Sequence, residues 1–79
     1  MNQIRQAIVT TYYGPTNTRG SLIRARADSG QITVPYDYNL DLESNHIVAA
    51  QQFQAKMNWK GELAGGSMPN PDSFVFVLI

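Results

Sequence analysis

The sequence predicts an α+β domain of order β-β-β-α-β, with a mostly antiparallel four-stranded sheet and one helix packed on one face. Two changes of hydrophobic period support this prediction. Residues 4–13, 21–27 and 31–36 show the patterns typical of strands, whereas residues 42–58 follow the 3.6-residue period of a helix. An apolar run at residues 73–79 then returns to strand-forming side chains. A chain of 79 residues is expected to form a single domain, over residues 1–79.

The first strand is expected from Ile4 to Tyr13, and either of its faces could be the buried one. The loop that follows, residues 14–21, should be ordered, because its glycines can take positive φ, proline fixes φ, and Thr, Asn and Ser bond to nearby backbone. The predicted structural residues of this loop are Gly14, Pro15, Asn17 and Gly20. The loop presents Arg19, whose planar guanidinium would either bind a carboxylate or phosphate or clamp backbone carbonyls of the domain.

The second and third strands are expected at residues 21–27 and 31–36, joined by a tight turn at residues 28–30. Alternation predicts an inward set of Ile23, Ala25, Ala27, Ile32, Val34 and Tyr36. The same alternation places Arg24 and Arg26 on the opposite face, toward water. Pro35 lacks a backbone donor, which predicts an edge position or the end of the strand.

The helix is expected from Leu42 to Asn58, with Asp41 as the first choice of N-cap and Ser44 as the alternative. One narrow arc of the helical wheel, predicted to cover the sheet, contains His46, Ala49, Ala50, Phe53 and Met57. Lys60-Gly61 should end the helical region, and residues 65–72 are rich enough in Gly and Pro to predict a loop. The last strand, residues 73–79, should lie beside the first, and a right-handed crossover would make that pair parallel.

Composition excludes several classes of function. Six basic residues balance six acidic ones, which argues against a strongly basic nucleic-acid binder and against an acidic DNA mimic. The absence of cysteine and the single histidine predict no metal site and no cofactor. No apolar run approaches the length of about 18 residues that a membrane span requires, and no leader is recognisable, so we expect neither a span nor a signal peptide.

His46 has two interpretations. A catalytic role would require a nucleophile or a positioned carboxylate, and the sequence shows neither pattern. The structural interpretation is a half-buried histidine that hydrogen-bonds to a loop carbonyl or to a tyrosine such as Tyr36 or Tyr38. We therefore predict a candidate polar pocket containing His46 and Tyr36, which Arg19 could also reach at the end of the sheet.

Segments spread over nearly the whole chain carry a resemblance to a known family. They are residues 13–21 (YGPTNTRGS), 34–37 (VPYD), 45–46 with the following alanines, 56–59 (KMNW), 65–66 (GG) and 74–77 (FVFV). With these segments the chain resembles a family of short open reading frames from phages and integrated mobile elements. The family pattern favours a basic residue after the loop serine, where this chain has Leu22, and this departure weakens the case for a phosphate-binding loop.

The resemblance implies a genomic setting rather than an activity, and short phage-borne domains are often counter-defence proteins such as anti-CRISPR inhibitors. We therefore predict a cofactor-free, non-enzymatic phage or mobile-element protein that inhibits a host defence machine by occupying a protein surface. The expected partner is a larger host protein complex in the host cytoplasm, such as a CRISPR effector subunit. The chain itself is expected to be a monomer or a weak dimer.

The open face of the sheet combines arginines with aromatic residues and is the predicted contact surface. The predicted partner-binding residues are Arg19, Arg24, Arg26, Tyr12 and Tyr13, with Arg5 as a further candidate. The alternative function is a nucleic-acid-binding accessory protein in which Arg19, Arg24 and Arg26 contact phosphates and aromatic side chains stack on bases.

Overall fold

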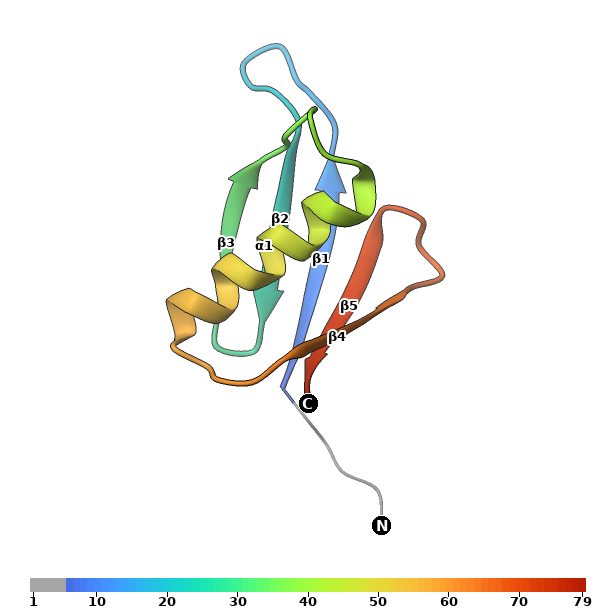
Figure 1. The fold of residues 1–79 in the computed structure, drawn as a ribbon. Helices are drawn as coiled ribbons and strands as arrows, with labels where there is room; N and C mark the ends of the chain where they lie inside the picture. The colour runs from blue at the N-terminus through green and yellow to red at the C-terminus, as the bar shows by residue number, and fades with distance from the viewer. Residues whose placement is uncertain (1–5) are drawn as a thin grey trace.

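The computed structural model describes residues 6–79 and confirms the α+β class (Figure 1). Its elements are β1 (Ala7–Tyr13), β2 (Leu22–Ala27), β3 (Gly30–Pro35), α1 (Leu42–Met57), β4 (Leu63–Ser67) and β5 (Ser73–Leu78). All neighbouring strands are antiparallel, in the order β3-β2-β1-β5-β4. The first strand was predicted to begin at Ile4, which lies outside the described residues.

The sheet has five strands rather than the predicted four. The additional strand, β4, includes Gly65 and Gly66, which were expected to lie in a loop. These glycines pair with β5, where Gly65 is opposite Phe76 and Gly66 is opposite Val75. Glycine weakens a strand through backbone entropy, but it also permits close approach by a large side chain. The register with β5 therefore outweighs the local loop signal.

The additional strand also corrects the predicted direction of β5. As expected, β5 lies beside β1, but the two strands are antiparallel, with Ile8 opposite Phe76. The reason is that α1 leads into β4 and the chain then reverses through a hairpin before β5 begins. The crossover through α1 therefore joins β3 and β4 at opposite edges of the sheet, and these two strands run in the same direction.

The core lies between α1 and one face of the sheet. Its buried apolar side chains are Ile8, Ile23, Ala25, Val34, Ala49, Ala50, Phe53 and Phe76. The predicted helix face and the inward sets of β2 and β3 are confirmed, with Ala27, Ile32, Tyr36 and Met57 packed around the core. In β1, whose orientation the sequence left open, the buried face contains Ile8 and Thr10, with Tyr12 against the core.

Both ends of α1 are capped. Asp41 is the N-cap, as predicted, and its side chain accepts a hydrogen bond of 2.7 Å from the backbone N–H of Ser44. The helix was predicted to run to Asn58; it ends one residue earlier, at Met57, and Asn58 is its C-cap in the left-handed conformation with φ 57°. Asparagine tolerates that region better than most residues, so it can end the helix before Lys60-Gly61.

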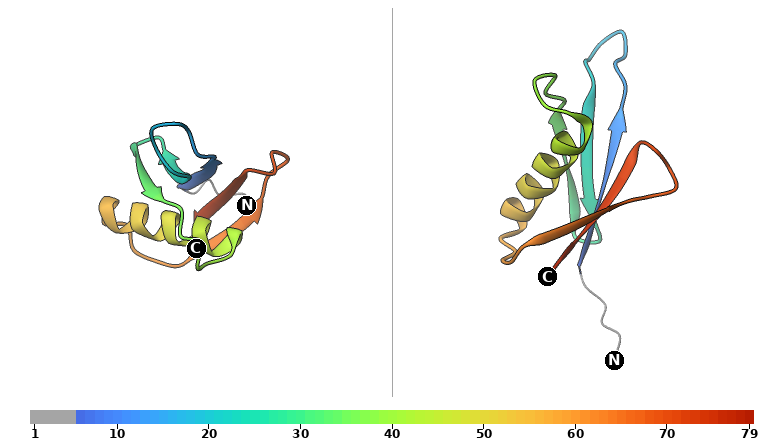
Figure 2. Two further views of the ribbon diagram at one scale, coloured as in Figure 1. Left: turned by 90° about the horizontal axis from the view of Figure 1, so that it is seen from above. Right: turned by 45° about the vertical axis from the view of Figure 1, so that its right-hand side comes forward.

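The sheet curls around α1, as the view from above shows (Figure 2). The helix packs mainly on β1, β2 and β3, so the β4–β5 hairpin extends beyond it along one side. The convex face of the sheet is not covered by any element of the described chain.

Candidate functional site

The uncovered face of the sheet presents a patch of apolar and basic side chains, which we call the open-face patch: Val9, Tyr13, Arg24, Arg26 and Val75. Val9 stands opposite Arg26 on one side and opposite Val75 on the other, so these three form one row across the sheet. The guanidinium carbon of Arg24 lies 5.0 Å from the centre of the Tyr13 ring, within the range of a cation–π contact. The sequence placed Arg24 and Arg26 on this face with Tyr12 or Tyr13 among them, and the tyrosine found there is Tyr13.

Arg24 is less exposed than alternation predicted. Its side chain is half-buried, whereas Arg26 is exposed. The Nε atom of Arg24 is buried and has no hydrogen-bond partner among the described residues. The contact with Tyr13 holds the guanidinium against the sheet. Arg5, the further candidate, lies outside the described residues.

Tyr12 does not belong to the open-face patch. It lies on the opposite face, where its ring makes an edge contact with Tyr36 at 5.4 Å and its hydroxyl lies 3.1 Å from Ser21 Oγ. Tyr38 also donates to Ser21 Oγ, at 2.8 Å, and its ring lies 5.1 Å from that of Tyr36. Tyr12 was assigned to the partner surface because the faces of β1 could not be distinguished by sequence. The structure instead places it in a tyrosine cluster at the base of the loop.

Arg19 clamps its own loop. Its Nη1 donates to the carbonyl oxygens of Gly14 and Gly20 at 3.1 and 3.0 Å, and its own carbonyl accepts from Thr16 N–H at 2.8 Å. Residues 14–20 of the loop are exposed, so these bonds compete with water. The geometry thus shows the clamp on backbone carbonyls, which is one of the two interpretations of Arg19.

The glycines and Asn17 support this loop differently from the prediction. Neither Gly14 nor Gly20 adopts positive φ; in the described chain the glycines that do are Gly30 and Gly61. Besides those of Arg19, the side-chain bonds within the loop come from Thr16 and Thr18 rather than from Asn17 among the described residues. The loop is therefore held mainly by hydrogen bonds and not by left-handed backbone.

His46 is buried completely, and its partner is neither a loop carbonyl nor a tyrosine. Its Nδ1 lies 2.6 Å from the hydroxyl of Thr10 on β1, and its ring lies 4.6 Å from that of Phe74. The second nitrogen, Nε2, is buried without a partner among the described residues. Burial lowers the pKa of His46, although the carboxylate of Asp72 acts in the opposite direction.

The predicted pocket of His46, Tyr36 and Arg19 is therefore not formed. His46 packs under β1 and β5, Tyr36 lies in the tyrosine cluster, and Arg19 is engaged in its own loop. Because His46 and Thr10 are both fully buried, neither can reach a substrate in this conformation. Their hydrogen bond stabilises a polar pair inside the core.

Asn45 is a structural residue that the sequence analysis missed. Its side-chain oxygen accepts from Asp37 N–H at 2.7 Å, and its amide donates to the carbonyls of Asp37 and Asp41, both at 2.9 Å. These bonds close the turn that leads from β3 into α1. The available signal was an asparagine in the first turns of a helix, where it is unfavourable unless its amide satisfies backbone groups.

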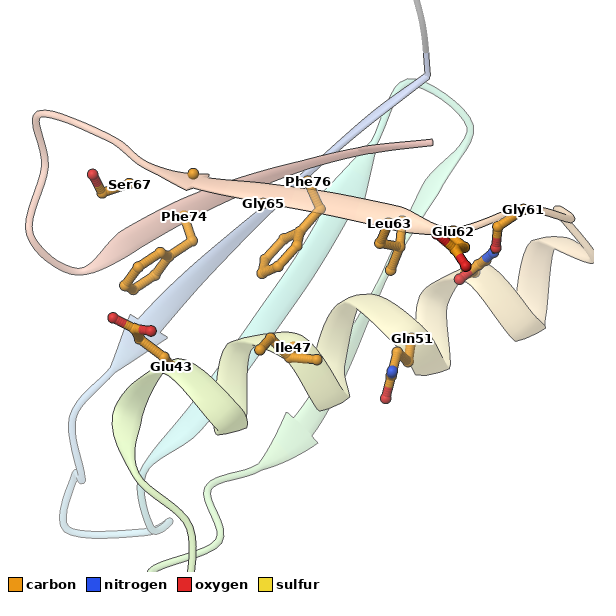
Figure 3. A pocket seen from close by; sticks show the side chains of 12 residues that line it. Glu43, Ile47, Gln51, Gly61, Glu62, Leu63, Gly65, Ser67, Phe74 and Phe76 are labelled. Atoms are coloured by element: carbon orange, nitrogen blue, oxygen red, sulfur yellow. The ribbon is translucent and has the colours of Figure 1, made fainter. Parts of the chain in front are cut away.

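A groove of about 730 Å³ runs between α1 and the β4–β5 hairpin (Figure 3). Its apolar lining consists of Ile47 from the helix and Leu63, Phe74 and Phe76 from the hairpin. At one end, the side-chain amide of Gln54 donates to the carbonyl of Gly61 at 2.8 Å and ties the helix to the segment before β4. Sequence analysis could not find this groove, because it depends on the unpredicted strand.

Comparison with known protein families, with curated proteins and with solved structures finds no match. Residues 6–79 contain no group of three or more His, Cys, Asp or Glu side chains placed to hold a metal ion. In the same range, no helix is long and apolar enough to cross a membrane.

Proposed function

We propose that this chain is a small binding protein that acts by docking its open-face patch on a larger protein complex. The observation that supports the proposal most is the Arg24–Tyr13 stack, with its ring centroid at 5.0 Å, on a sheet face that no described element covers. Arginine and tyrosine are enriched among residues that dominate interface energies, and a side chain fixed in advance loses less entropy on binding. Val9 and Val75 provide adjacent apolar area.

The proposed partner is a host defence machine, and the proposed effect is inhibition by occupying its surface, as anti-CRISPR proteins do. The support for this choice is the resemblance of the sequence segments to short open reading frames of phages and mobile elements. A domain of 79 residues can block a site on a large complex without chemistry of its own. The proposed location is accordingly the host cytoplasm.

The test is capture from a host lysate combined with phage plating. The tagged protein should retain a subunit of a defence complex and should raise plating efficiency on CRISPR-immune hosts. Arg24→Ala should weaken the captured interaction about 30-fold, the effect of losing about 2 kcal/mol at a central interface residue. Lys60→Ala removes the same charge from an exposed position outside the patch and is the matched control.

Arg24→Lys refines this test. Lysine keeps the charge but loses the planar group that stacks on Tyr13, so it should not restore full affinity. Capture of no defence subunit, together with unchanged plating, would contradict the proposal. Equal loss of binding in Arg24→Ala and Lys60→Ala would place the contact elsewhere.

The second candidate function is nucleic-acid binding, and one observation favours it. Arg24, Arg26 and the Tyr13 ring occupy one face, the combination that contacts phosphates and stacks bases. Arg19 does not join these residues, because its guanidinium is hydrogen-bonded to its own loop. Retardation of single-stranded DNA or RNA at low salt, falling steeply as salt rises, would support this function. Absence of retardation at low salt would exclude it.

A further inference from the structure

We propose that the free edge of β4 and the groove beneath it bind an extended segment of a partner protein as a sixth strand. The segment would carry apolar side chains at its centre and lysine or arginine at its ends. This proposal does not depend on the open-face patch, because the edge and the groove lie on the other side of the sheet. It rests on three features: unpaired backbone groups, an apolar cavity and the sign of the surrounding charge.

The unpaired backbone groups can be identified from the register. Ile79 N–H donates to the carbonyl of Glu62 at 2.9 Å, so these two residues form a hydrogen-bonded pair. Such pairs alternate along antiparallel strands. The backbone groups of Ala64 and Gly66 are therefore directed at β5. Those of Leu63, Gly65 and Ser67 point away from β5, and β4 is the last strand of the sheet on this side.

The two edges of the sheet are not equivalent. On the β3 edge, Pro35 lacks a donor and Lys56 Nζ lies 3.5 Å from the carbonyl oxygen of Gln31. Proline and lysine at an edge oppose the addition of another strand. β4 has the sequence LAGGS, with no proline and no charge, and all of it except Leu63 is exposed. The β4 edge is thus the one that can accept a partner strand.

The groove accounts for the side chains of that strand. In a sheet, side chains opposite one another share a face, so alternate residues of an added strand would lie on the face of Leu63 and Ser67. That face is the one that Phe74 and Phe76 share, and it looks across the groove to Ile47 (Figure 3). Ile47 is 43% exposed, and its apolar surface lacks a covering residue in the described chain. Apolar side chains of the added strand would fill this space.

The charge of the groove selects the ends of the segment. Its charged lining residues in the described chain are Glu43 and Glu62, which lie toward opposite ends (Figure 3). No lysine or arginine among residues 6–79 lines it. Basic residues at the two ends of a bound segment would therefore face carboxylates, while acidic residues would be repelled.

A second copy of the chain is a poor occupant. Paired β4 strands would bring two Glu62 side chains toward the same interface and would offer the groove only Leu63, Gly65 and Ser67, two of which are too small to fill it. The cavity of about 730 Å³ would remain largely empty. A segment of a different protein, with larger side chains, fits both the volume and the charge.

The probe is the acetylated and amidated peptide Lys-Thr-Val-Thr-Val-Thr-Lys. Its alternate residues place two valines and two terminal lysines on one face, and its sequence reads the same in both directions, so it can pair parallel or antiparallel. Titration into isotope-labelled protein should shift the NMR signals of Gly65 and Ser67 and those of residues lining the groove. Peptides with both lysines replaced by glutamate, or both valines by threonine, should bind at least about threefold more weakly.

Backbone pairing is tested by N-methylation. Only every second N–H of an added strand faces β4, so methylating the two valines and methylating the three threonines should have opposite results. One peptide should lose at least about tenfold in affinity, the effect of losing about 1.4 kcal/mol, and the other should bind like the parent. Equal affinities of the two methylated peptides would overturn strand addition. Absence of shifts on β4 with the parent peptide would overturn the site itself.

Protein variants locate the charge contacts. Glu43→Lys and Glu62→Lys should each lower the affinity for the lysine peptide at least about threefold and raise the affinity for the glutamate peptide. Asp28→Lys makes the same change of charge in the β2–β3 turn, outside the groove lining, and should leave both affinities nearly unchanged. Equal effects of all three variants would overturn the assignment of Glu43 and Glu62.

Separate variants distinguish this site from the open-face patch. Arg24→Ala should leave peptide binding unchanged, and Ile47→Gln should weaken peptide binding without weakening capture by the open face. Peptide binding lost in Arg24→Ala would refute this proposal while leaving the proposed function intact. Formation of a dimer that excludes the peptide would show that a second copy is the occupant and would also refute it.

Discussion

The two adjacent glycines of β4 should respond oppositely to alanine. A Cβ atom at Gly65 would lie 2.6 and 2.7 Å from two ring carbons of Phe76, whereas a Cβ at Gly66 would meet nothing within 4 Å. Neither glycine has positive φ, so backbone strain does not distinguish them. The Phe76 ring is only 5% exposed and belongs to the core. Alanine substitutions at the two glycines therefore test whether the Phe76 ring lies against Gly65 of β4.

The magnitude follows from the size of the clash. Carbon atoms in contact are normally about 3.5–4.0 Å apart, so the ring or the strand must move by about 1 Å. Because the ring is buried, we expect Gly65→Ala to cost about 1–3 kcal/mol, as overpacked sites do. Gly66→Ala removes freedom only from the unfolded chain and should stabilise the fold by about 0.4–1 kcal/mol.

Thermal and urea unfolding of the two variants measure the difference. A domain of this size shifts by about 4–8 °C per kcal/mol, so Gly65→Ala should melt at least about 4 °C below Gly66→Ala. The double variant Gly65→Ala/Phe76→Leu should cost less than the sum of its parts, because leucine vacates the space that the new methyl group needs. Equal melting temperatures of the two alanine variants would show that β4 pairs with β5 in another register.

Three further predictions concern the core, the loop and pH. Phe53→Ala should cost about 3–5 kcal/mol, since Phe53 is fully buried, and a melting temperature near that of the unchanged protein would contradict the packing of α1. Arg19→Ala should cost at most about 1 kcal/mol, because the carbonyls it leaves are exposed to water, and a larger loss in urea unfolding would contradict this. The lowered pKa of His46 makes the neutral ring the native form, so stability should be complete above the ordinary value of 6.5 and fall as the pH drops below it. Asp41 also has a lowered pKa, but its contribution is lost only below its ordinary value of 3.8, so urea unfolding between these pH values isolates His46, and constant stability there would contradict its burial.

Local patterns were sufficient for the elements whose buried face repeats clearly. Ile23 and Ala25 alternate with arginines, and His46 is the one polar residue in the predicted helix arc around Phe53. Asp41 was recognisable as an N-cap from its chemistry alone. β4 was not recognisable, because Gly65 and Gly66 form a strand only through their pairing with Phe76 and Val75 of β5. The residues around Gly65 and Gly66 do not by themselves indicate the register with β5.

The candidate surface was predictable in part for the same reason. Alternation placed Arg24 and Arg26 together, but it could not assign β1, in which both faces contain Thr and Tyr. The choice depends on Thr10, which is buried because His46, 36 positions away, satisfies its hydroxyl. Assigning Thr10 to the core then fixes Tyr12 inside and Tyr13 outside. The hydrogen bond between Thr10 and His46 therefore determines that Tyr13, and not Tyr12, lies on the open face.

The alternation of β5 separates the two proposed binding surfaces and also links them. Val75 faces the open side of the sheet, while its neighbours Phe74 and Phe76 line the groove. A substitution of Arg24 in the open-face patch and one of Glu43 at the groove should therefore act independently of each other, because the two side chains share no contact. Displacement of the hairpin itself removes that independence, since it moves Val75 and the groove lining together. Gly65→Ala should consequently weaken both the capture of a protein complex and the binding of the extended peptide. The neighbouring Gly66→Ala should not displace the hairpin and should therefore weaken neither kind of binding. Loss of only one kind of binding in Gly65→Ala would show that the surfaces do not share β5.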